Sequence, residues 1–143
     1  MTEPKGGLFI TLEGGEGGGK STQARLLAEF LELRGEEVVL TREPGGSPGA
    51  EQIRSLLVDG ETHRWDATTE ALLHFAARRD HLVKTVIPAL DRGAWVVCDR
   101  FADSTMAYQG YGHGLPKEAL AVLYDFAVGT IKPDLTLVLD LPV

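Results

Sequence analysis

A glycine-rich segment near the N-terminus constrains this chain more than any other feature. Residues 14–21 are Gly-Gly-Glu-Gly-Gly-Gly-Lys-Ser, which has the spacing of a phosphate-binding loop, or P-loop: a glycine, four residues, then Gly-Lys-Ser. An apolar run at 8–12 precedes it, and a helical pattern follows from about residue 20 to 34. The strand and helix that should flank a P-loop are therefore both predicted, and the alternative is a glycine-rich turn at the same junction.

Each part of this loop has a physical role toward phosphate. Glycines let successive backbone N–H groups turn toward phosphate oxygens, where a side chain would obstruct them. Lys20 adds a positive charge at the β and γ phosphates, the Ser21 hydroxyl can ligate Mg²⁺, and the helix N-terminus adds its dipole. The predicted nucleotide-binding residues are Gly14, Gly15, Glu16, Gly17, Gly18, Gly19, Lys20, Ser21 and Thr22.

The remaining pattern predicts an α/β fold. Apolar runs at 38–40, 95–98 and 135–139 lack period-two alternation and are separated by helical patterns, which is typical of a parallel sheet covered on both faces. We expect a three-layer α/β/α P-loop domain over residues 1–143. No helical pattern follows the run at 135–139, so we expect the chain to be incomplete at its C-terminus.

Two helical patterns carry specific expectations. The first should bury one broad face that consists of Leu26, Leu27, Phe30, Leu31 and Leu33. The second runs from 66 to 90, with Asp66 as its N-cap and a kink or an end at Pro88.

Composition excludes several classes of protein. The chain has 14 basic and 21 acidic side chains, and its formal charge of −7 argues against a broad basic face for nucleic-acid polymers. Its one cysteine, Cys98, excludes an internal disulfide and fits a reducing cytosol. The run at 8–12 is too short for a signal or membrane segment. We therefore expect a cytoplasmic domain with no membrane or nucleic-acid polymer as partner, and the histidines show no metal-ligand spacing with Cys98.

Asp99 and Asp140 each follow an apolar strand, where a carboxylate associated with Mg²⁺ is expected. Arg100 could place its charge between donor and acceptor phosphates, and the alternative is a solvated Asp-Arg pair. Asp140 is the weaker candidate and could equally be a turn residue. Residues 131–134, Ile-Lys-Pro-Asp, lack the asparagine of a guanine-binding motif and indicate a turn, which weakens the GTPase interpretation.

Six segments together resemble the bacterial thymidylate kinases in their order and spacing, over essentially the whole chain. The most specific are Arg-Glu-Pro-Gly-Gly at 42–46, and Asp-Arg-Phe at 99–101 combined with Tyr-Gln-Gly at 108–110. The others are the P-loop, Ile-Arg-Ser-Leu-Leu at 53–57 and Thr-Glu-Ala-Leu-Leu at 69–73. The resemblance implies transfer of the ATP γ-phosphoryl group to dTMP, giving dTDP for dTTP synthesis, with Mg²⁺ required. It also implies a homodimer.

The same resemblance implies roles for single residues. Arg54, Arg78 and Arg100 would gather at the acceptor monophosphate, because guanidinium forks suit phosphate. The catalytic residues would be Lys20, Arg100, Asp99 and Glu16, with Ser21 and Asp99 at the metal. Glu43 would contact the deoxyribose side, and Arg78, Thr105 and Gln109 would address the thymine edge.

The chain departs from the family pattern at two places. His74 stands where the family commonly has a phenylalanine on the thymine ring, so either His74 or its neighbour Phe75 stacks there, although a core position is expected for Phe75. The family also continues past residue 143 with an arginine-bearing lid, a last strand and helices. The alternatives to a thymidylate kinase are a P-loop kinase for another small acceptor, a nucleotide-binding switch ATPase, and an inactive fragment.

Overall fold

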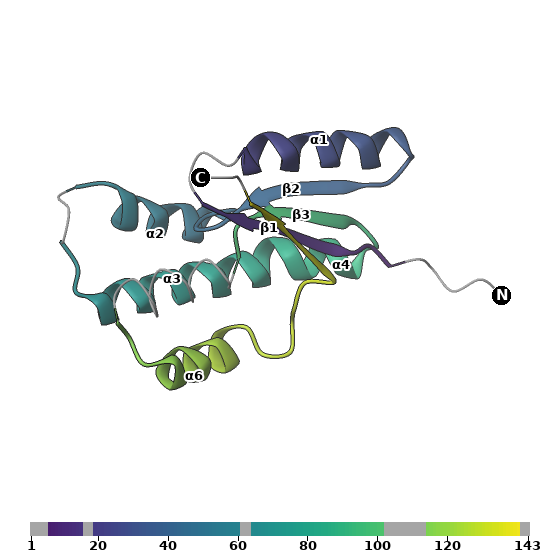
Figure 1. The fold of residues 1–143 in the computed structure, drawn as a ribbon. Coiled ribbons are helices and arrows are strands. Elements are labelled where there is room, and N and C mark those ends of the chain that lie inside the picture. Colours follow the sequence, from purple (N-terminus) through teal and green to yellow (C-terminus); the bar gives the residue numbers. More distant parts are fainter. Residues whose placement is uncertain (1–5, 16–18, 61–63, 102–113, 141–143) are drawn as a thin grey trace.

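Four parallel strands form the centre of the molecule, which we describe from a computed structural model (Figure 1). The model describes residues 6–15, 19–60, 64–101 and 114–140. The strands are β1 (Phe9–Gly14), β2 (Val38–Arg42), β3 (Trp95–Asp99) and β4 (Leu135–Leu139), in the spatial order β2-β3-β1-β4. Phe9 pairs with Val96 across β1 and β3, and Val38 pairs with Trp95 across β2 and β3. The parallel sheet confirms the predicted α/β fold class.

Helices lie on both faces of this sheet, so the structure has three layers (Figure 1). On one face lies α1 (Lys20–Leu33). On the other, α3 (Ala67–His81) continues through a π-helical turn, η1 (Leu82–Val86), into α4 (Ile87–Asp91). The helix α6 (Lys117–Ala127) packs beside α3, and α2 (Pro48–Val58) also packs against α3.

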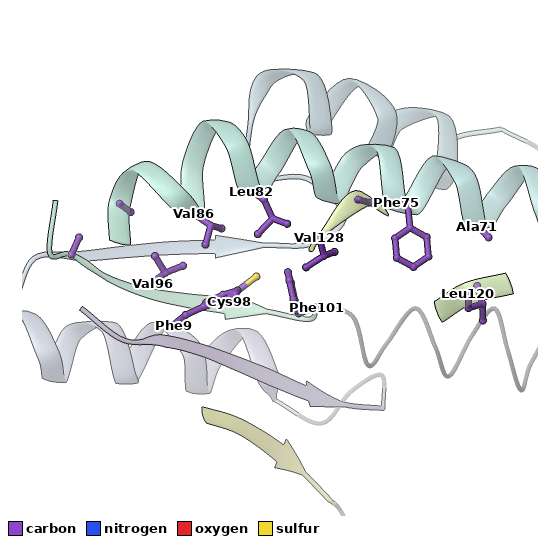
Figure 2. Packing of buried hydrophobic residues seen from close by; sticks show 13 residues of the cluster. Phe9, Ala71, Phe75, Leu82, Val86, Val96, Cys98, Phe101, Leu120 and Val128 are labelled. Atoms are coloured by element: carbon purple, nitrogen blue, oxygen red, sulfur yellow. The ribbon is translucent and has the colours of Figure 1, made fainter. Parts of the chain in front are cut away.

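Alternate residues of the central strands supply the two cores, because successive side chains of a strand point to opposite faces. Phe9, Val96 and Cys98 face α3 and its continuation, where they meet Leu82 and Val86 (Figure 2). On the other face, strand residues pack against α1; they are Ile10, Leu12 and Val97. The near-continuous apolar strand sequences follow from burial on both faces.

The predicted buried face of α1 is only partly right. Of the five residues proposed for it, Leu31 is buried and Leu27 is half-buried. Leu26, Phe30 and Leu33 are 47%, 53% and 88% exposed. The helix instead buries Ala24 and Ala28, because small side chains allow its backbone to approach the sheet closely.

The long helical pattern from 66 to 90 forms as predicted, with one deformation. The Asp66 carboxylate accepts a hydrogen bond of 2.7 Å from Thr69 N–H, which confirms it as the N-cap. Pro88 does not end the helix: the backbone widens into the π-turn of η1 just before it and continues to Asp91.

Candidate active site

The carboxyl ends of the four strands lie along one edge of the sheet, and the polar residues predicted from the sequence follow them. β1 leads into the P-loop, β2 leads into Glu43, β3 ends at Asp99 with Arg100 next, and Asp140 follows β4. Backbone hydrogen bonds link these ends, from Glu43 N–H to Asp99 O at 3.0 Å and from Arg100 N–H to Leu12 O at 2.9 Å. In open parallel sheets ligands bind at this edge.

The two ends of the P-loop are held in place by different contacts. A Cβ on Gly14 would lie 2.6 Å from Leu139 O, so the first glycine is required by its close approach to β4. Gly19, with φ at 80°, is the left-handed residue from which α1 starts. Lys20 is buried, and its ammonium donates to Gly15 O at 2.7 Å. Ser21 and Thr22 are exposed at the first turn of α1, while Glu16, Gly17 and Gly18 lie outside the described residues.

A cavity of about 450 Å³ opens between α1 and the ends of β2 and β3. Ser21 and Asp99 both line it, so the two residues expected at Mg²⁺ share one space. The Asp99 Oδ1 atom is buried and has no hydrogen-bond partner among the described residues. A buried carboxylate oxygen in this position fits a cation or a water bound to one. The described residues contain no cluster of three or more His, Cys, Asp or Glu side chains suited to a metal.

Arg42 and Glu51 line the same cavity and pair with each other. Their side chains are 3.1 Å apart, and Glu51 also accepts from Gly46 N–H at 2.9 Å. The Gly46 N–H, followed by Arg42, lowers the pKa of Glu51 below its ordinary value. Glu51 therefore stays ionised and fixes the turn after β2.

The acceptor side predicted by the resemblance is built around the dipeptide Glu43–Pro44. Arg54 Nη1 donates to Pro44 O at 2.8 Å, and Arg78 Nε donates to Glu43 Oε1 at 2.6 Å. The Arg78 side chain is 3% exposed, and its guanidinium carbon lies 5.2 Å from the ring centre of Phe75 and 5.1 Å from that of Phe101. The structure thus brings Arg54, Arg78 and Glu43 together in one place.

Two pairs of neighbouring residues on α3 differ in burial and partners. Arg78 points into the Glu43 cluster, whereas Arg79 is exposed and its Nη1 atom donates to Ala127 O at 3.3 Å. Phe75 is 3% exposed in the core, and His74 is half-buried. Which of these two meets a base remains a prediction, and so does the sugar contact of Glu43. Thr105 and Gln109 lie outside the described residues.

Two buried polar residues were missed from the sequence. Glu13, at the end of β1, is 5% exposed and accepts from Phe101 N–H at 3.2 Å. His81 is fully buried; its Nδ1 lies 2.7 Å from Glu43 Oε2, and its Nε2 lies 2.7 Å from Thr41 Oγ1. Glu13 could have been identified from the sequence as a charged residue within an apolar strand. No local sequence pattern indicated that His81 is buried.

Cys98 is a core residue whose thiol donates a hydrogen bond to the backbone oxygen of Arg100 at 3.1 Å. It is fully buried between the sheet and α3, and this burial raises the pKa of its thiol well above the ordinary value. The thiol therefore stays protonated, as expected for a small apolar side chain in a strand. No helix within the described ranges is long and apolar enough to cross a membrane.

The fold and the site together define an α/β protein with a P-loop sequence after its first strand and a cluster of Glu43, Arg54 and Arg78 at the same edge of the sheet. A family model described as "Thymidylate kinase" matches residues 12–143. The chain belongs to the thymidylate kinase family.

Individual relatives agree with this assignment. The curated "Thymidylate kinase" of Caulobacter vibrioides is 58% identical over 136 residues, which cover 95% of this chain and 65% of that protein. The one from Gluconobacter oxydans is 61% identical over 140 residues, covering 95% of this chain and 64% of that protein. A crystal structure of thymidylate kinase from Ehrlichia chaffeensis matches with a TM-score of 0.86 at 46% identity, over 94% of this chain and 72% of that one. The chain therefore spans about 65% of the length of curated relatives such as the Caulobacter protein.

Proposed function

We propose that this chain forms the nucleotide-binding and acceptor-binding part of a thymidylate kinase. The reaction would transfer the γ-phosphoryl group of ATP to dTMP and yield dTDP for dTTP synthesis in the cytoplasm. The observation that carries the proposal is the placement of Lys20, the Asp99–Arg100 strand end and the Glu43–Arg54–Arg78 cluster along one edge of one sheet. Family membership supports the choice of acceptor.

The proposed chemistry is a direct in-line transfer with no covalent enzyme intermediate. Lys20 and the P-loop N–H groups would hold ATP, and Arg100 would stabilise the charge on the transferring phosphoryl group. Arg54 and Arg78 would hold dTMP with its phosphate and base oriented. Glu16, Thr105 and Gln109 remain proposed contacts of the acceptor.

The two residues predicted from the sequence as Mg²⁺ ligands are suited to hold this ion. Ser21 and Asp99 line the same cavity, and the buried Asp99 Oδ1 has no other partner in the described part of the chain. When bound there, the ion would neutralise phosphate charge during transfer. We expect Asp99→Asn to lower ATP affinity about 10-fold in the presence of Mg²⁺ and to leave affinity in EDTA unchanged. Asp91→Asn, which removes an exposed carboxylate at the end of α4, is the control, and an equal loss in both variants would contradict the role of Asp99.

Calorimetric titration of dTMP, dUMP and dAMP into the folded chain tests the acceptor. We expect dTMP to bind at least 10-fold more tightly than the other two, because a base-specific site rejects a monophosphate with mismatched donors and acceptors. Comparable affinity for dUMP would point to a kinase with a broader acceptor. Absent binding of all three, with ATP still bound, would overturn the thymidylate assignment in favour of a nucleotide-binding switch.

A homodimer is part of the proposal, and an exposed apolar surface supports it. α3 and α6 together border a pocket of about 530 Å³ whose lining includes Leu72, Ala76, Leu123 and Phe126. Leu72 is 50% exposed and Phe126 is 89% exposed. Apolar side chains gathered in this way are typical of a surface that a second copy of the chain covers.

A further inference from the structure

A buried chain of hydrogen bonds connects β2 to α3. It runs from Thr41 Oγ1 to His81 Nε2, from His81 Nδ1 to Glu43 Oε2, and from Glu43 Oε1 to Arg78 Nε, with lengths of 2.7, 2.7 and 2.6 Å. The His81 side chain is fully buried, and those of Glu43 and Arg78 are each 3% exposed. The two bonds to Glu43 are therefore shielded from water, where hydrogen bonds to charged groups are strongest, whereas the bond to Thr41 is only partly buried.

The chemistry of the groups sets the direction of these bonds. Arg78 can only donate, so Glu43 Oε1 accepts from its Nε. His81 Nδ1 then carries the hydrogen that it donates to the second oxygen of Glu43. In the tautomer with its hydrogen on Nδ1, Nε2 accepts from the Thr41 hydroxyl, so both ring nitrogens have partners.

We propose that His81 is a positioning residue for the acceptor nucleotide: it fixes the Glu43 carboxylate, which in turn orients the Arg78 guanidinium. This inference rests on the proposed function, because it takes Arg78 as the residue that addresses the acceptor. The carbon of this guanidinium lies over the rings of Phe75 and Phe101, at 5.2 and 5.1 Å from their centres. The Glu43 carboxylate adds a directed hydrogen bond at Nε.

The path of the loop after β2 does not depend on His81. Asp80 Oδ2 accepts from Ser47 Oγ at 2.7 Å and from Ala50 N–H at 3.1 Å, and Thr85 Oγ1 donates to Gly46 O at 2.6 Å. These bonds attach the loop to α3 and η1 by other side chains. The contact of His81 with Glu43 is therefore separable from general support of the loop.

Three substitutions at His81 separate positioning from packing. An asparagine amide can replace Nδ1–H, whereas a glutamine amide reaches toward Thr41 instead, and leucine has no donor. We expect His81→Asn to bind dTMP within about 3-fold of wild type, and His81→Gln and His81→Leu to bind it about 10- to 100-fold more weakly. The affinity for ATP, measured by the same calorimetry, should change less than about 3-fold in all three.

Asp80→Asn is the matched control on the adjacent residue, because it weakens the loop without touching Glu43. We expect it to lower the thermal midpoint and leave the ratio of dTMP to ATP affinity unchanged. If His81→Gln binds dTMP as His81→Asn does, or if Asp80→Asn shifts the ratio as much as His81→Gln, the positioning role is wrong. Wild-type chain that binds ATP but no dTMP would instead overturn the proposed function itself.

A double-variant cycle measures the coupling between His81 and Glu43 in dTMP binding, and it does not require His81→Leu to fold. If His81 acts through Glu43, then Glu43→Gln combined with His81→Gln should weaken dTMP binding no more than the worse single variant does. Additive losses would show that the two residues act independently and would overturn the proposal.

Discussion

Arg100 combines an unusual backbone conformation with a proposed catalytic role. Its φ of 72° places a non-glycine residue in the left-handed region, where the side chain clashes with its own backbone. The preceding strand imposes this turn, because Arg100 N–H still bonds to Leu12 O at 2.9 Å as a continuation of the ladder. Strain of this kind persists where the surrounding structure determines the backbone, and it often marks functional sites.

Two substitutions at Arg100 separate the strain from the guanidinium. Arg100→Gly should be more stable than Arg100→Ala by about 1 kcal/mol, because glycine adopts this φ without the Cβ clash. Both should lose dTMP affinity by 10-fold or more, since both lack the charge. Urea denaturation and calorimetry of the two proteins measure these effects. Equal stability of the two variants would show that the backbone relaxes when the arginine is removed.

Among the elements, the loop after β2 depends most on contacts from distant sequence. It is held to α3 and η1 by Asp80 and Thr85. Gly46 belongs to this loop and has a φ of 92°. A side chain at this position would have no space, because an added Cβ would collide with His81 and Thr41. The glycine is therefore required by packing as well as by backbone conformation.

We expect Gly46→Ala to lower the free energy of unfolding by about 3 kcal/mol, because the added methyl group must displace the buried imidazole. Gly35→Ala is the matched control: its φ of 87° is similar, but no atom lies within 4 Å of the added Cβ. It should cost only about 1 kcal/mol. Chemical denaturation measures both, and a similar cost at the two sites would mean that His81 moves aside freely.

The carboxylate of Asp80 makes the attachment of this loop sensitive to acid. The hydrogen bond from Lys84, followed by that from Ser47, lowers the pKa of Asp80 below its ordinary value of 3.8. A depressed pKa in the folded state contributes stability above the ordinary value, and this contribution is lost as the pH falls through the folded pKa.

Asp80→Asn should therefore lower the free energy of unfolding by about 1–2 kcal/mol at pH 7. It should also flatten the decline of stability below pH 3.8, the ordinary value for this group. Denaturation at a series of pH values measures the slope. Glu51→Gln serves as comparison, because the Gly46 N–H lowers the pKa of Glu51 in a similar way. An unchanged slope in Asp80→Asn would refute the acid linkage.

At the scale of the whole molecule, exposed apolar side chains are unevenly placed. Phe126 on α6 is 89% exposed beside the pocket bordered by α3, and Leu33 at the end of α1 is 88% exposed on the opposite side of the sheet. The two residues expose similar fractions, and Phe126 lines the pocket between α3 and α6 whereas Leu33 does not. They form a matched pair for testing the proposed dimer.

Phe126→Glu should shift the chain toward monomer, weakening association 10-fold or more, because a charge would be buried at the interface. Leu33→Glu should leave the sedimentation coefficient unchanged. Neither should alter the thermal midpoint by more than about 3 °C, since both side chains are already exposed. Sedimentation velocity over a range of concentrations distinguishes the two, and an unchanged distribution in Phe126→Glu would exclude this surface as the dimer contact.

The sequence by itself determined the local features of this protein. The P-loop spacing, the strand–loop–helix order, the Asp66 cap and the strand ends at Asp99 all depend on residues a few positions apart, where periodicity and stereochemistry act directly. The parallel sheet was predicted because these apolar strands lack period-two alternation and are separated by helices. The resemblance added Arg54, Arg78 and Glu43, which the structure brings together.

Only the tertiary structure decided which faces are buried and which distant side chains meet. The apolar stripe of α1 was wider than the surface it covers, so the sequence could not show that Ala24 and Ala28, rather than Phe30, face the sheet. His81 and Glu43 are 38 positions apart and belong to different elements. Their contact depends on the packing of α3 against the end of β2, and no local pattern records it, because burial is a property of the assembled layers.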